Sequence, residues 1–526
     1  MTEIRLHVDG REVTVDDDAA TLLEVLRDRL GVRSPKDGCS PQGQCGCCTV
    51  LVDGQPRVSC VTPVRRVAGR VITTADGLPD GVRTAWSEAL CATGGSQCEF
   101  CTPGIVCRLA GLAAKEPDLP GPAVEKALQA HLCRCTGWQT IVEAAALVGA
   151  GDPVTREVGA SLRGRDPAAA RRRATLEGGA PQQVGPEVSL GHAGFADDTA
   201  PAGALVAVPD GVGGWVVGET LAAARAAAGK VQGRNTTAPT AWPVEAPAGE
   251  WARTLVSTWT EPAYLETDAS WCDVSGDPVS PLANGGAFGA KRASVVIDAA
   301  QRLAREHGRP VRVLLSREDV VRLGPKRPPM AVALRADGTG VVRVRRTPGL
   351  SELLGRLAPG LVVDEVDLPG PPTSLDLRGA GWLEPLVALG SLGRRLDGSD
   401  AGDGWVTAPS GGRARATVGD DGSIQVQVEA GELLDAVVLR SYAIGAAHQA
   451  LGLVTSEAIA LDGDGSPRDL TIRSFGVLRA LDTPRIDVDL VAGEREAVNG
   501  SEAVLAAVAL AVWQARGFAP RWPASS

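Results

Sequence analysis

The positions of the cysteines constrain this chain more than any other feature of its sequence. Eleven of the twelve cysteines lie before residue 136. The first thiol set has the spacing C-x5-C-x2-C-x11-C and consists of Cys39, Cys45, Cys48 and Cys60. The second thiol set lies in the segments QCEFC and LCRC and consists of Cys98, Cys101, Cys133 and Cys135. Two sets of four thiols within one short stretch predict two metal sites.

Two kinds of metal centre suit four thiols at such spacings. Four-cysteine sites built from C-x2-C halves often hold structural zinc. The first thiol set, however, is close to the plant-type C-x4-C-x2-C…C run that holds a [2Fe–2S] cluster. Disulfides are a third possibility, but they persist mainly in exported proteins, and the N-terminus MTEIRLHVDG carries no secretory signal. We therefore expect two [2Fe–2S] clusters in a cytoplasmic protein.

Residues 1 to about 150 resemble the iron–sulfur subunit of the molybdenum hydroxylases, the group of xanthine dehydrogenase, aldehyde oxidase and aerobic carbon monoxide dehydrogenase. The matching segments are GCSPQGQCGCCTVLVDG, QCEFCTPG and LCRCTGW. The family usually has four residues where this chain has five between Cys39 and Cys45, and we expect a loop through Gly43 to absorb the extra one. Cys47 is interpreted as a bystander, with competition for the metal as the alternative.

The first 76 residues have the pattern of a β-grasp ferredoxin domain. Alternating segments flank Asp9-Gly10 and Asp53-Gly54, dipeptides that favour tight hairpin turns. Between the hairpins, residues 21–30 have apolar side chains on one face of a helix. Hairpin, helix, loop and hairpin in this order predict a β-grasp domain over residues 1–76.

The next segments are predicted to be helical and then irregular. Residues 77–150 have apolar residues at helical spacing, and the resemblance implies a four-helix [2Fe–2S]-binding domain there. Residues 151–177 mix Pro, Gly and Arg without an apolar face, so we expect a solvated linker that includes the basic run 171–173. The whole chain is expected to be of the α+β class.

Residues 178–526 resemble, with low identity and large gaps, a shortened molybdopterin-binding large subunit of mixed α/β structure. The best match begins at NGGAFGAK and runs to the SRE and PKR segments, and RGAGWLEP is a second match. The resemblance implies that a molybdopterin would contact a glycine-rich loop and an arginine, namely Gly285, Gly286, Phe288, Gly289 and Arg378. Without the resemblance, the loop is a bare turn before a helix, and the arginine is a surface ion-pair partner.

The same resemblance implies a catalytic residue near the C-terminus. Glu502 aligns with the glutamate that active family members use as general base. A solvent-facing glutamate in the first turn of a helix is the alternative. The sequence lacks the family's GQG segment, and the region after the linker is about half as long as the family's catalytic subunit. These departures leave open whether this region binds molybdenum.

Composition excludes some functions and leaves three hypotheses. A net charge of −10 argues against nucleic-acid binding, and without an uninterrupted apolar stretch of about 18 residues we expect no membrane insertion. The first hypothesis is an oxidoreductase that oxidises a small aldehyde or N-heterocycle and passes electrons through two clusters to a flavin or other acceptor. The second is a non-catalytic electron-transfer subunit that docks to an FAD-binding or separate molybdopterin subunit, or forms an oligomer. The third is a zinc-stabilised interaction protein.

Overall fold

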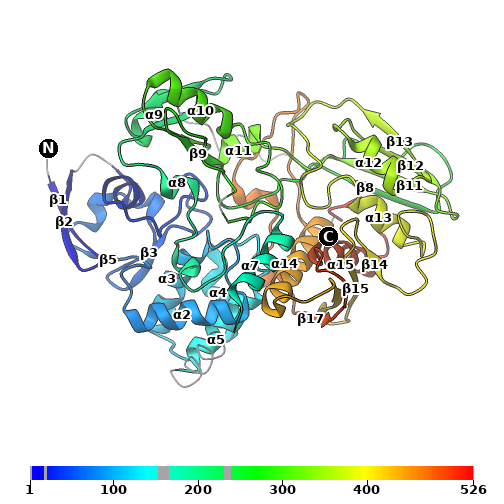
Figure 1. Ribbon diagram of the computed structural model, residues 1–526, viewed down its shortest axis with the longest axis horizontal. Coiled ribbons are helices and arrows are strands. Elements are labelled where there is room, and N and C mark those ends of the chain that lie inside the picture. The colour runs from blue at the N-terminus through cyan, green and yellow to red at the C-terminus, as the bar shows by residue number, and fades with distance from the viewer. Residues whose placement is uncertain (1–2, 17–19, 152–164, 230–238, 283, 525–526) are drawn as a thin grey trace.

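The computed structural model describes residues 3–16, 20–151, 165–229, 239–282 and 284–524. Figure 1 shows the N-terminal strands at one end of an elongated molecule and the sheet that contains β11–β13 at the other. The helices α14 and α15 lie near the middle. The structure mixes helices with four separate sheets in the described part of the chain, which confirms the α+β class.

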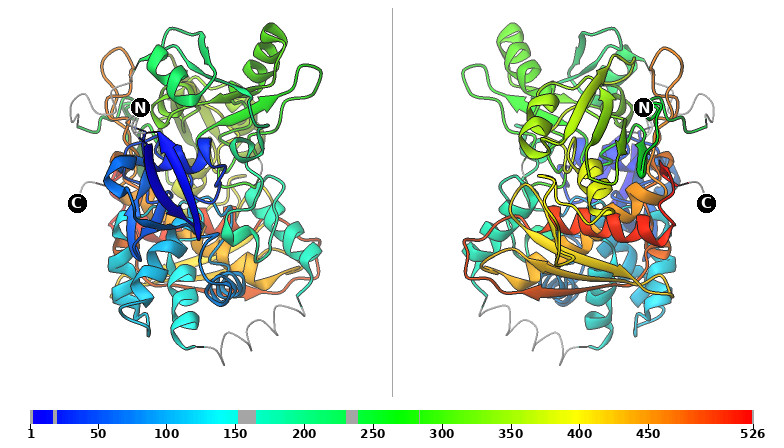
Figure 2. Two further views of the ribbon diagram at one scale, coloured as in Figure 1. Left: turned by 90° about the vertical axis from the view of Figure 1, so that its left-hand side faces the viewer. Right: turned by 90° about the vertical axis from the view of Figure 1, so that its right-hand side faces the viewer.

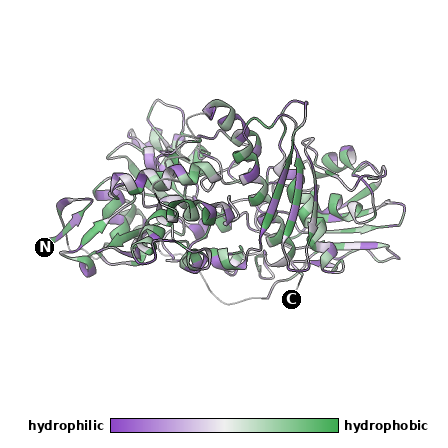
Figure 3. Cartoon of the chain, turned by 90° about the horizontal axis from the view of Figure 1, so that it is seen from below, coloured by the Kyte–Doolittle hydropathy of each residue, from purple (hydrophilic) through white to green (hydrophobic). Residues whose placement is uncertain are grey.

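The N-terminal sheet is that of a β-grasp domain. Its strands are β1 (Glu3–Val8), β2 (Arg11–Asp16), β3 (Thr49–Val52), β4 (Gln55–Val58) and β5 (Val71–Thr73). The spatial order is β2-β1-β5-β3-β4, with β1 parallel to β5 and antiparallel pairing elsewhere. Along β1 every second residue is buried. Figure 3, which is coloured by hydropathy, shows hydrophilic and hydrophobic residues close together in the strands nearest the N-terminus.

Both predicted hairpin turns are confirmed. Asp9 and Gly10 have φ of 48° and 77°, and Asp53 and Gly54 have φ of 47° and 74°. Two successive residues with positive φ are what a type I′ turn requires. The predicted helix at 21–30 is one α-turn, α1 (Leu22–Glu24), continued by a π-helical segment, η1 (Val25–Arg29).

The next 70 residues are helical, as predicted. The helices are α2 (Asp80–Thr93), α3 (Thr102–Ala113), α4 (Gly121–Ala127) with a short extension η4 (Leu128–Ala130), and α5 (Gln139–Gly149). One hydrophobic cluster contains residues of these helices, all eight thiols of the two sets, and residues from 259–265 and 459–480. The thiols therefore lie in a core that the N-terminal and C-terminal parts of the chain share.

The prediction of a solvated linker is wrong for the residues that the structure describes there. Residues 152–164 lie outside the described residues, but Pro167–Gly178 forms helix α7. Asp166 caps its N-terminus by accepting a hydrogen bond from Ala168 N at 2.8 Å. Arg173, expected to be solvated, is 0% exposed, because long-range partners on other elements satisfy its guanidinium group.

The described residues after α7 form three sheets. The first has the order β7-β6-β10-β9 and the strands β6 (Leu205–Pro209), β7 (Trp215–Gly218), β9 (Ala269–Cys272) and β10 (Val311–Leu314). The second has the order β13-β12-β11-β8-β18 and the strands β8 (Arg253–Ser257), β11 (Met330–Leu334), β12 (Gly340–Arg345), β13 (Leu361–Val366) and β18 (Arg521–Trp522). The third has the order β14-β15-β16-β17 and the strands β14 (Val406–Thr407), β15 (Arg413–Val418), β16 (Ile424–Glu429) and β17 (Ile486–Val491).

Helices cover these sheets. The α-helices are α8 (Ala196–Thr199), α9 (Leu221–Ala228), α10 (Val296–His307), α11 (Arg317–Leu323), α12 (Leu350–Leu357), α13 (Leu383–Gly390), α14 (Ala436–Thr455) and α15 (Ser501–Ala515). Short 3₁₀ turns are η2 (Ser59–Val61), η3 (Val64–Val67), η5 (Val188–Leu190), η6 (Ile472–Phe475) and η7 (Ala480–Asp482). The third sheet packs against α14 and α15, which lie across its strands in Figure 2.

Helix α14 is apolar on nearly all sides. Within the described residues it is the one helix long and apolar enough, by length and composition, to cross a membrane. In the structure 83% of that window is buried inside the protein. A helix that is hydrophobic all round and covered by other elements has the character of a core helix.

Candidate functional site

The first thiol set is buried and its four sulfurs lie together. The Cys39 sulfur exchanges hydrogen bonds with the Cys45 and Cys60 thiols, and Cys60 also bonds to Cys48. The bond from Cys45 is the main cause that holds the pKa of Cys39 well below its usual range. The sequence motif therefore brings these four sulfurs together, with the Cys47 thiol beside Cys45.

The extra residue between Cys39 and Cys45 is accommodated in a tight loop. Ser40 and Gly43 both have positive φ, 52° and 69°. The backbone N–H of Gln42 donates to the Cys39 sulfur at 3.2 Å. The loop thus turns at Gly43, as expected, and its backbone also supplies a donor to a ligand sulfur.

The second thiol set falls into two pairs. The sulfurs of Cys98 and Cys135 lie 3.5 Å apart. A hydrogen bond from Cys101 lowers the pKa of Cys133 to about 6, although burial opposes this shift. Thr136 Oγ1 lies 3.1 Å from the Cys133 sulfur as a further polar neighbour. Cys101 is the N-cap of α3, so this ligand stands at the positive end of a helix, where an anionic thiolate is stabilised.

Both thiol sets fit a two-iron cluster. A [2Fe–2S] cluster takes four cysteine thiolates, two on each iron, and each set supplies four buried cysteines that are free of disulfides. In the described part of the chain, no group of three or more His, Cys, Asp or Glu side chains is arranged to hold a single metal ion.

The loops that carry the two thiol sets touch each other. The backbone N–H of Leu132 donates to the carbonyl of Cys45 at 3.0 Å, and Leu132 directly precedes Cys133. Gly46 has φ of 76° and lies against the ring of His131, 2.5 Å from where a Cβ would stand. Burial lowers the pKa of His131 to about 3, so its imidazole is neutral in this contact.

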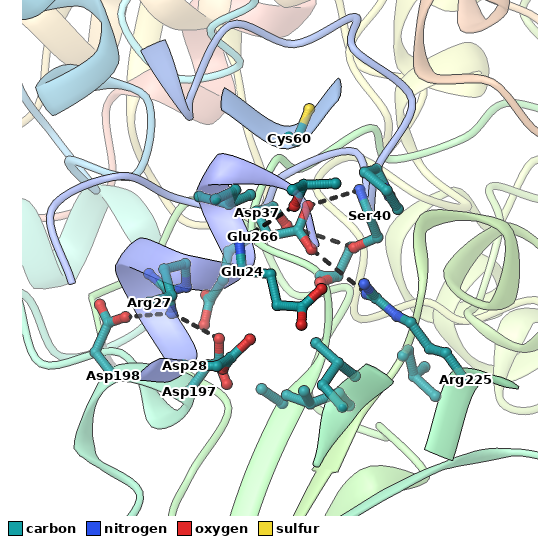
Figure 4. A pocket seen from close by; sticks show the side chains of 18 of the residues that line it. Glu24, Arg27, Asp28, Asp37, Ser40, Cys60, Asp197, Asp198, Arg225 and Glu266 are labelled. Atoms are coloured by element: carbon teal, nitrogen blue, oxygen red, sulfur yellow. Dashed lines mark hydrogen bonds and ion pairs between the residues drawn. The ribbon is translucent and has the colours of Figure 1, made fainter. Parts of the chain in front are cut away.

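A cavity of about 190 Å³ lies beside the first thiol set. Cys60 lines it together with residues of η1, α8 and α9. Figure 4 shows Arg27 between Asp197 and Asp198, with both carboxylates at 2.7 Å. Arg225 reaches across the cavity to Asp37 at 3.4 Å. The charged groups at the first thiol set are therefore largely paired with one another.

The residues predicted to contact a pterin come together beside the second thiol set. Gly286 lies against Cys98, whose sulfur would be 2.8 Å from an added Cβ. The guanidinium of Arg378 stands 4.4 Å from the centre of the Phe288 ring, and the backbone N–H of Arg378 donates to the Phe288 carbonyl at 3.0 Å. Gly289 packs against the carbonyl of Asp376. Arg378 is half-buried, so it is not the fully exposed ion-pair partner of the alternative interpretation.

Glu502 lies in the first turn of α15, and its charge acts on the Arg378 guanidinium. Its side chain is half-buried. Arg378 also donates to Gln449 Oε1 at 3.2 Å and to Ser501 Oγ. These polar groups thus form one neighbourhood, and they already bond to each other.

Two residues in this neighbourhood were not predicted. Glu177 of α7 lies in the segment expected to be linker and accepts a hydrogen bond from Arg378 through its carbonyl. Gln182, which lies just after that segment, packs against Gly285. The available signal was the spacing of Arg173 and Glu177, which suits an i,i+4 ion pair on a helix that starts at Asp166-Pro167.

Comparison with protein-family models and known proteins places the matches mainly in the N-terminal part. Residues 6–69 match the family "2Fe-2S iron-sulfur cluster binding domain" and residues 74–146 match "[2Fe-2S] binding domain". The chain is 41% identical over 143 residues to the nicotine 6-hydroxylase small subunit of Paenarthrobacter nicotinovorans. That match covers 27% of this chain and 86% of the small subunit.

Longer relatives match over the same part. The aldehyde oxidoreductase of Megalodesulfovibrio gigas is 39% identical over 158 residues, which are 28% of this chain and 17% of that protein. The chain therefore spans less than a fifth of this relative's length in that match. Among solved structures, an aldehyde oxidoreductase from Desulfovibrio gigas superposes with a TM-score of 0.67 at 16% identity, covering 100% of this chain and 99% of the other. At that identity the likeness concerns the fold alone.

Proposed function

Because this chain belongs to the molybdenum hydroxylase family, through domains that transfer electrons by [2Fe–2S] clusters, we propose that it is the electron-transfer subunit of such an oxidoreductase. The first thiol set would hold one cluster and the second thiol set the other. Each cluster, when bound, accepts and releases one electron at a time. The contribution of the protein is to fix the positions of the clusters and to shield them from water.

The observation that carries this proposal is the hydrogen bond from Leu132 N–H to the Cys45 carbonyl. This 3.0 Å hydrogen bond joins Cys45, a ligand of the first site, to Leu132, the residue directly before the ligand Cys133 of the second site. The closeness of Gly46 to His131 keeps the two loops together. The neutral imidazole adds no charge between the two sites.

The positions of the two sites suggest a direction for the electrons. The second thiol set lies next to the region that contains Gly286 and Arg378, whereas Cys60 of the first lines a separate cavity. We infer that electrons enter at the second site and leave at the first, toward a flavin or another acceptor. The substrate, a small aldehyde or an N-heterocycle, would be oxidised in a partner subunit of a cytoplasmic complex.

Rapid-mixing reduction of the anaerobically purified chain tests this proposal. Dithionite should reduce two clusters, seen as two electron paramagnetic resonance signals that each account for about one spin per chain. After partial reduction, the two signals should reach their equilibrium ratio within the mixing time. Two signals that relax to equilibrium only by exchange between molecules, at a rate proportional to protein concentration, would contradict an internal path.

A further inference from the structure

Helix α7 reaches the part of the fold where the resemblance would place a pterin cofactor. The Glu177 carboxylate accepts hydrogen bonds from Gly500 N at 3.1 Å and from Ser501 N at 2.8 Å. These amides begin α15, where unpaired N–H groups and the helix dipole favour an anion. In addition, Asn499 Nδ2 donates to the Leu176 carbonyl at 2.8 Å. The anion position at the start of α15 is therefore filled by a side chain of the protein itself.

The carboxylate is held there by a buried arginine. Arg173 Nη1 lies 3.1 Å from Glu177 Oε1, and both side chains are 0% exposed. The same guanidinium donates to the Val498 carbonyl at 2.8 Å and to the Leu433 carbonyl at 3.1 Å. A buried charge pair that loses one member leaves the other uncompensated, which is costly. Arg173 thus fixes Glu177 in place and ties α7 to the loops around it.

The glycine-rich loop is covered in a similar way. The side-chain amide of Gln182 would be 1.8 Å from a Cβ added at Gly285, so it occupies the space directly above that glycine. The neighbouring Gln183 N–H donates to Asn284 Oδ1 at 2.7 Å. Because Gly285 has no side chain, the amide of Gln182 can pack directly against the glycine-rich loop.

The remaining space is too small for a cofactor. The cavity lined by Gly285, Gly286 and the second thiol set measures about 10 Å³, and a neighbouring one measures about 20 Å³. Pockets for ligands of cofactor size measure roughly 300–1,000 Å³, whereas one water needs roughly 10–15 Å³. Among the described residues, Gln182 Nε2 and Gln97 Oε1 are buried without a hydrogen-bond partner, and both residues line the larger cavity. A cavity of this size holds about one water.

We propose that helix α7 and the residues after it take the place of the pterin cofactor, so that this chain carries iron–sulfur clusters and no molybdopterin. Glu177 replaces an anionic group at the start of α15, and Gln182 replaces the group that would lie on the glycine-rich loop. Glu502 then has no metal-bound group to deprotonate and is a first-turn residue of α15. Substrate oxidation must take place on another chain. The inference concerns α7 and its surroundings alone and does not depend on the electron path.

Cofactor analysis tests the inference directly. The full chain is produced in a host that makes molybdopterin, beside a molybdenum hydroxylase that serves as the loading control. Iron, molybdenum and the fluorescent pterin released by acid and iodine are then measured. We expect iron in this chain with less than about a tenth of the control's molybdenum and pterin per chain. Molybdenum and pterin equal to the control would overturn the inference but leave the electron-transfer proposal intact.

Hydrogen exchange tests the position of Glu177 independently of loading. In the wild-type chain the amides of Gly500 and Ser501 should exchange slowly, and Glu177→Gln should accelerate their exchange roughly tenfold or more, since a hydrogen bond to a charged group is lost. Glu496→Gln is the matched control, because Glu496 also pairs with an arginine of α7, Arg172, but is exposed. Equal exchange in the wild type and Glu177→Gln would overturn the inference, as would an equal change in the control.

Discussion

The first 150 residues and the region from 178 onward differ in what they share with their relatives. The N-terminal part is 41% identical to a small iron–sulfur subunit, and its two thiol sets each bring four sulfurs together. The C-terminal part has the fold of an aldehyde oxidoreductase at 16% identity for the whole chain, yet its glycine-rich loop faces the protein's own Gln182. The same chain thus keeps the geometry of one kind of site and fills the space of another.

The difference has a physical explanation. Cluster ligands are bonded directly to metal, so their number, spacing and backbone turns are set by the cluster. A sheet packed against helices needs only buried apolar residues of suitable volume, which many sequences supply. The third sheet and its helices α14 and α15 are held by such a core, largely of Ala, Val and Leu. A fold can therefore persist while the residues at one of its sites change.

The largest expected effect is the loss of one cluster while the other remains. Cys98→Ser should remove the second cluster, lower the iron content from about four to about two per chain, and abolish one of the two resonance signals. Electron flow from the partner subunit to the acceptor should stop. Cys107→Ser in α3 is the control, because that buried cysteine belongs to neither set. Full iron and both signals in Cys98→Ser would contradict the ligand assignment.

The second prediction concerns the buried pair of α7. Glu177→Gln leaves the charge of Arg173 uncompensated at 0% exposure, and we expect the free energy of unfolding to fall by about 3–5 kcal/mol. Urea unfolding followed by circular dichroism measures this change. Glu496→Gln, at an exposed pair, should leave stability almost unchanged. A small loss for Glu177→Gln would mean that α7 is only loosely attached, and the contrast between the two regions would weaken.

The third prediction concerns pH and the surface where the two regions meet. Burial, together with the positive charge of Arg134 from the helical domain, lowers the pKa of His448 in α14 to about 4. Between pH about 6.5 and about 4 the unfolded chain binds a proton that the folded chain does not. The free energy of unfolding should therefore fall with decreasing pH in this window, by about 1.4 kcal/mol per pH unit from this group.

Unfolding curves of His448→Gln between pH 7 and 5 check this contribution. The variant should show a shallower loss of stability on acidification than the wild type. His7→Gln is the control, because His7 lies on the exposed face of β1. If the two variants have the same pH dependence, His448 binds a proton in the folded state and its pKa is not lowered.

The smallest expected effect tests the contact between the second thiol set and the glycine-rich loop. Gly286→Ala would place a Cβ 2.8 Å from the Cys98 sulfur, so the second cluster's resonance signal should shift while the first signal and the iron content stay the same. Gly308→Ala is the control, because Gly308 has a similar positive φ but open space around it. A shift in neither signal would mean that the loop stands away from the cluster.

Local signals made the N-terminal part predictable. The hairpins follow from Asp9-Gly10 and Asp53-Gly54, and the thiol sets follow from their spacing, because each feature is encoded within a few residues. The π-helical continuation of α1 was not predictable, since the apolar face at 21–30 is the same for either helix. The exact loop at Cys39 was foreseen only as a turn through Gly43.

Helix α7 was missed because its stability comes from distant partners. The segment lacks an apolar face, and Arg173 is buried by bonds to carbonyls some 260 and 325 residues further along the chain. Nothing near Glu177 in the sequence indicates the amides of Gly500 and Ser501. Similarly, Gly285 and Arg378 were placed in one neighbourhood by resemblance, but what occupies the space between them could be learned only from the packed structure.

The most direct test of the central claim is an analysis of iron, acid-labile sulfide and zinc in the anaerobically purified chain, combined with electron paramagnetic resonance after reduction. The account predicts about four irons and about four sulfides per chain, no zinc, and two distinct signals of equal intensity. Zinc in place of iron, or two irons with a single signal, would contradict it.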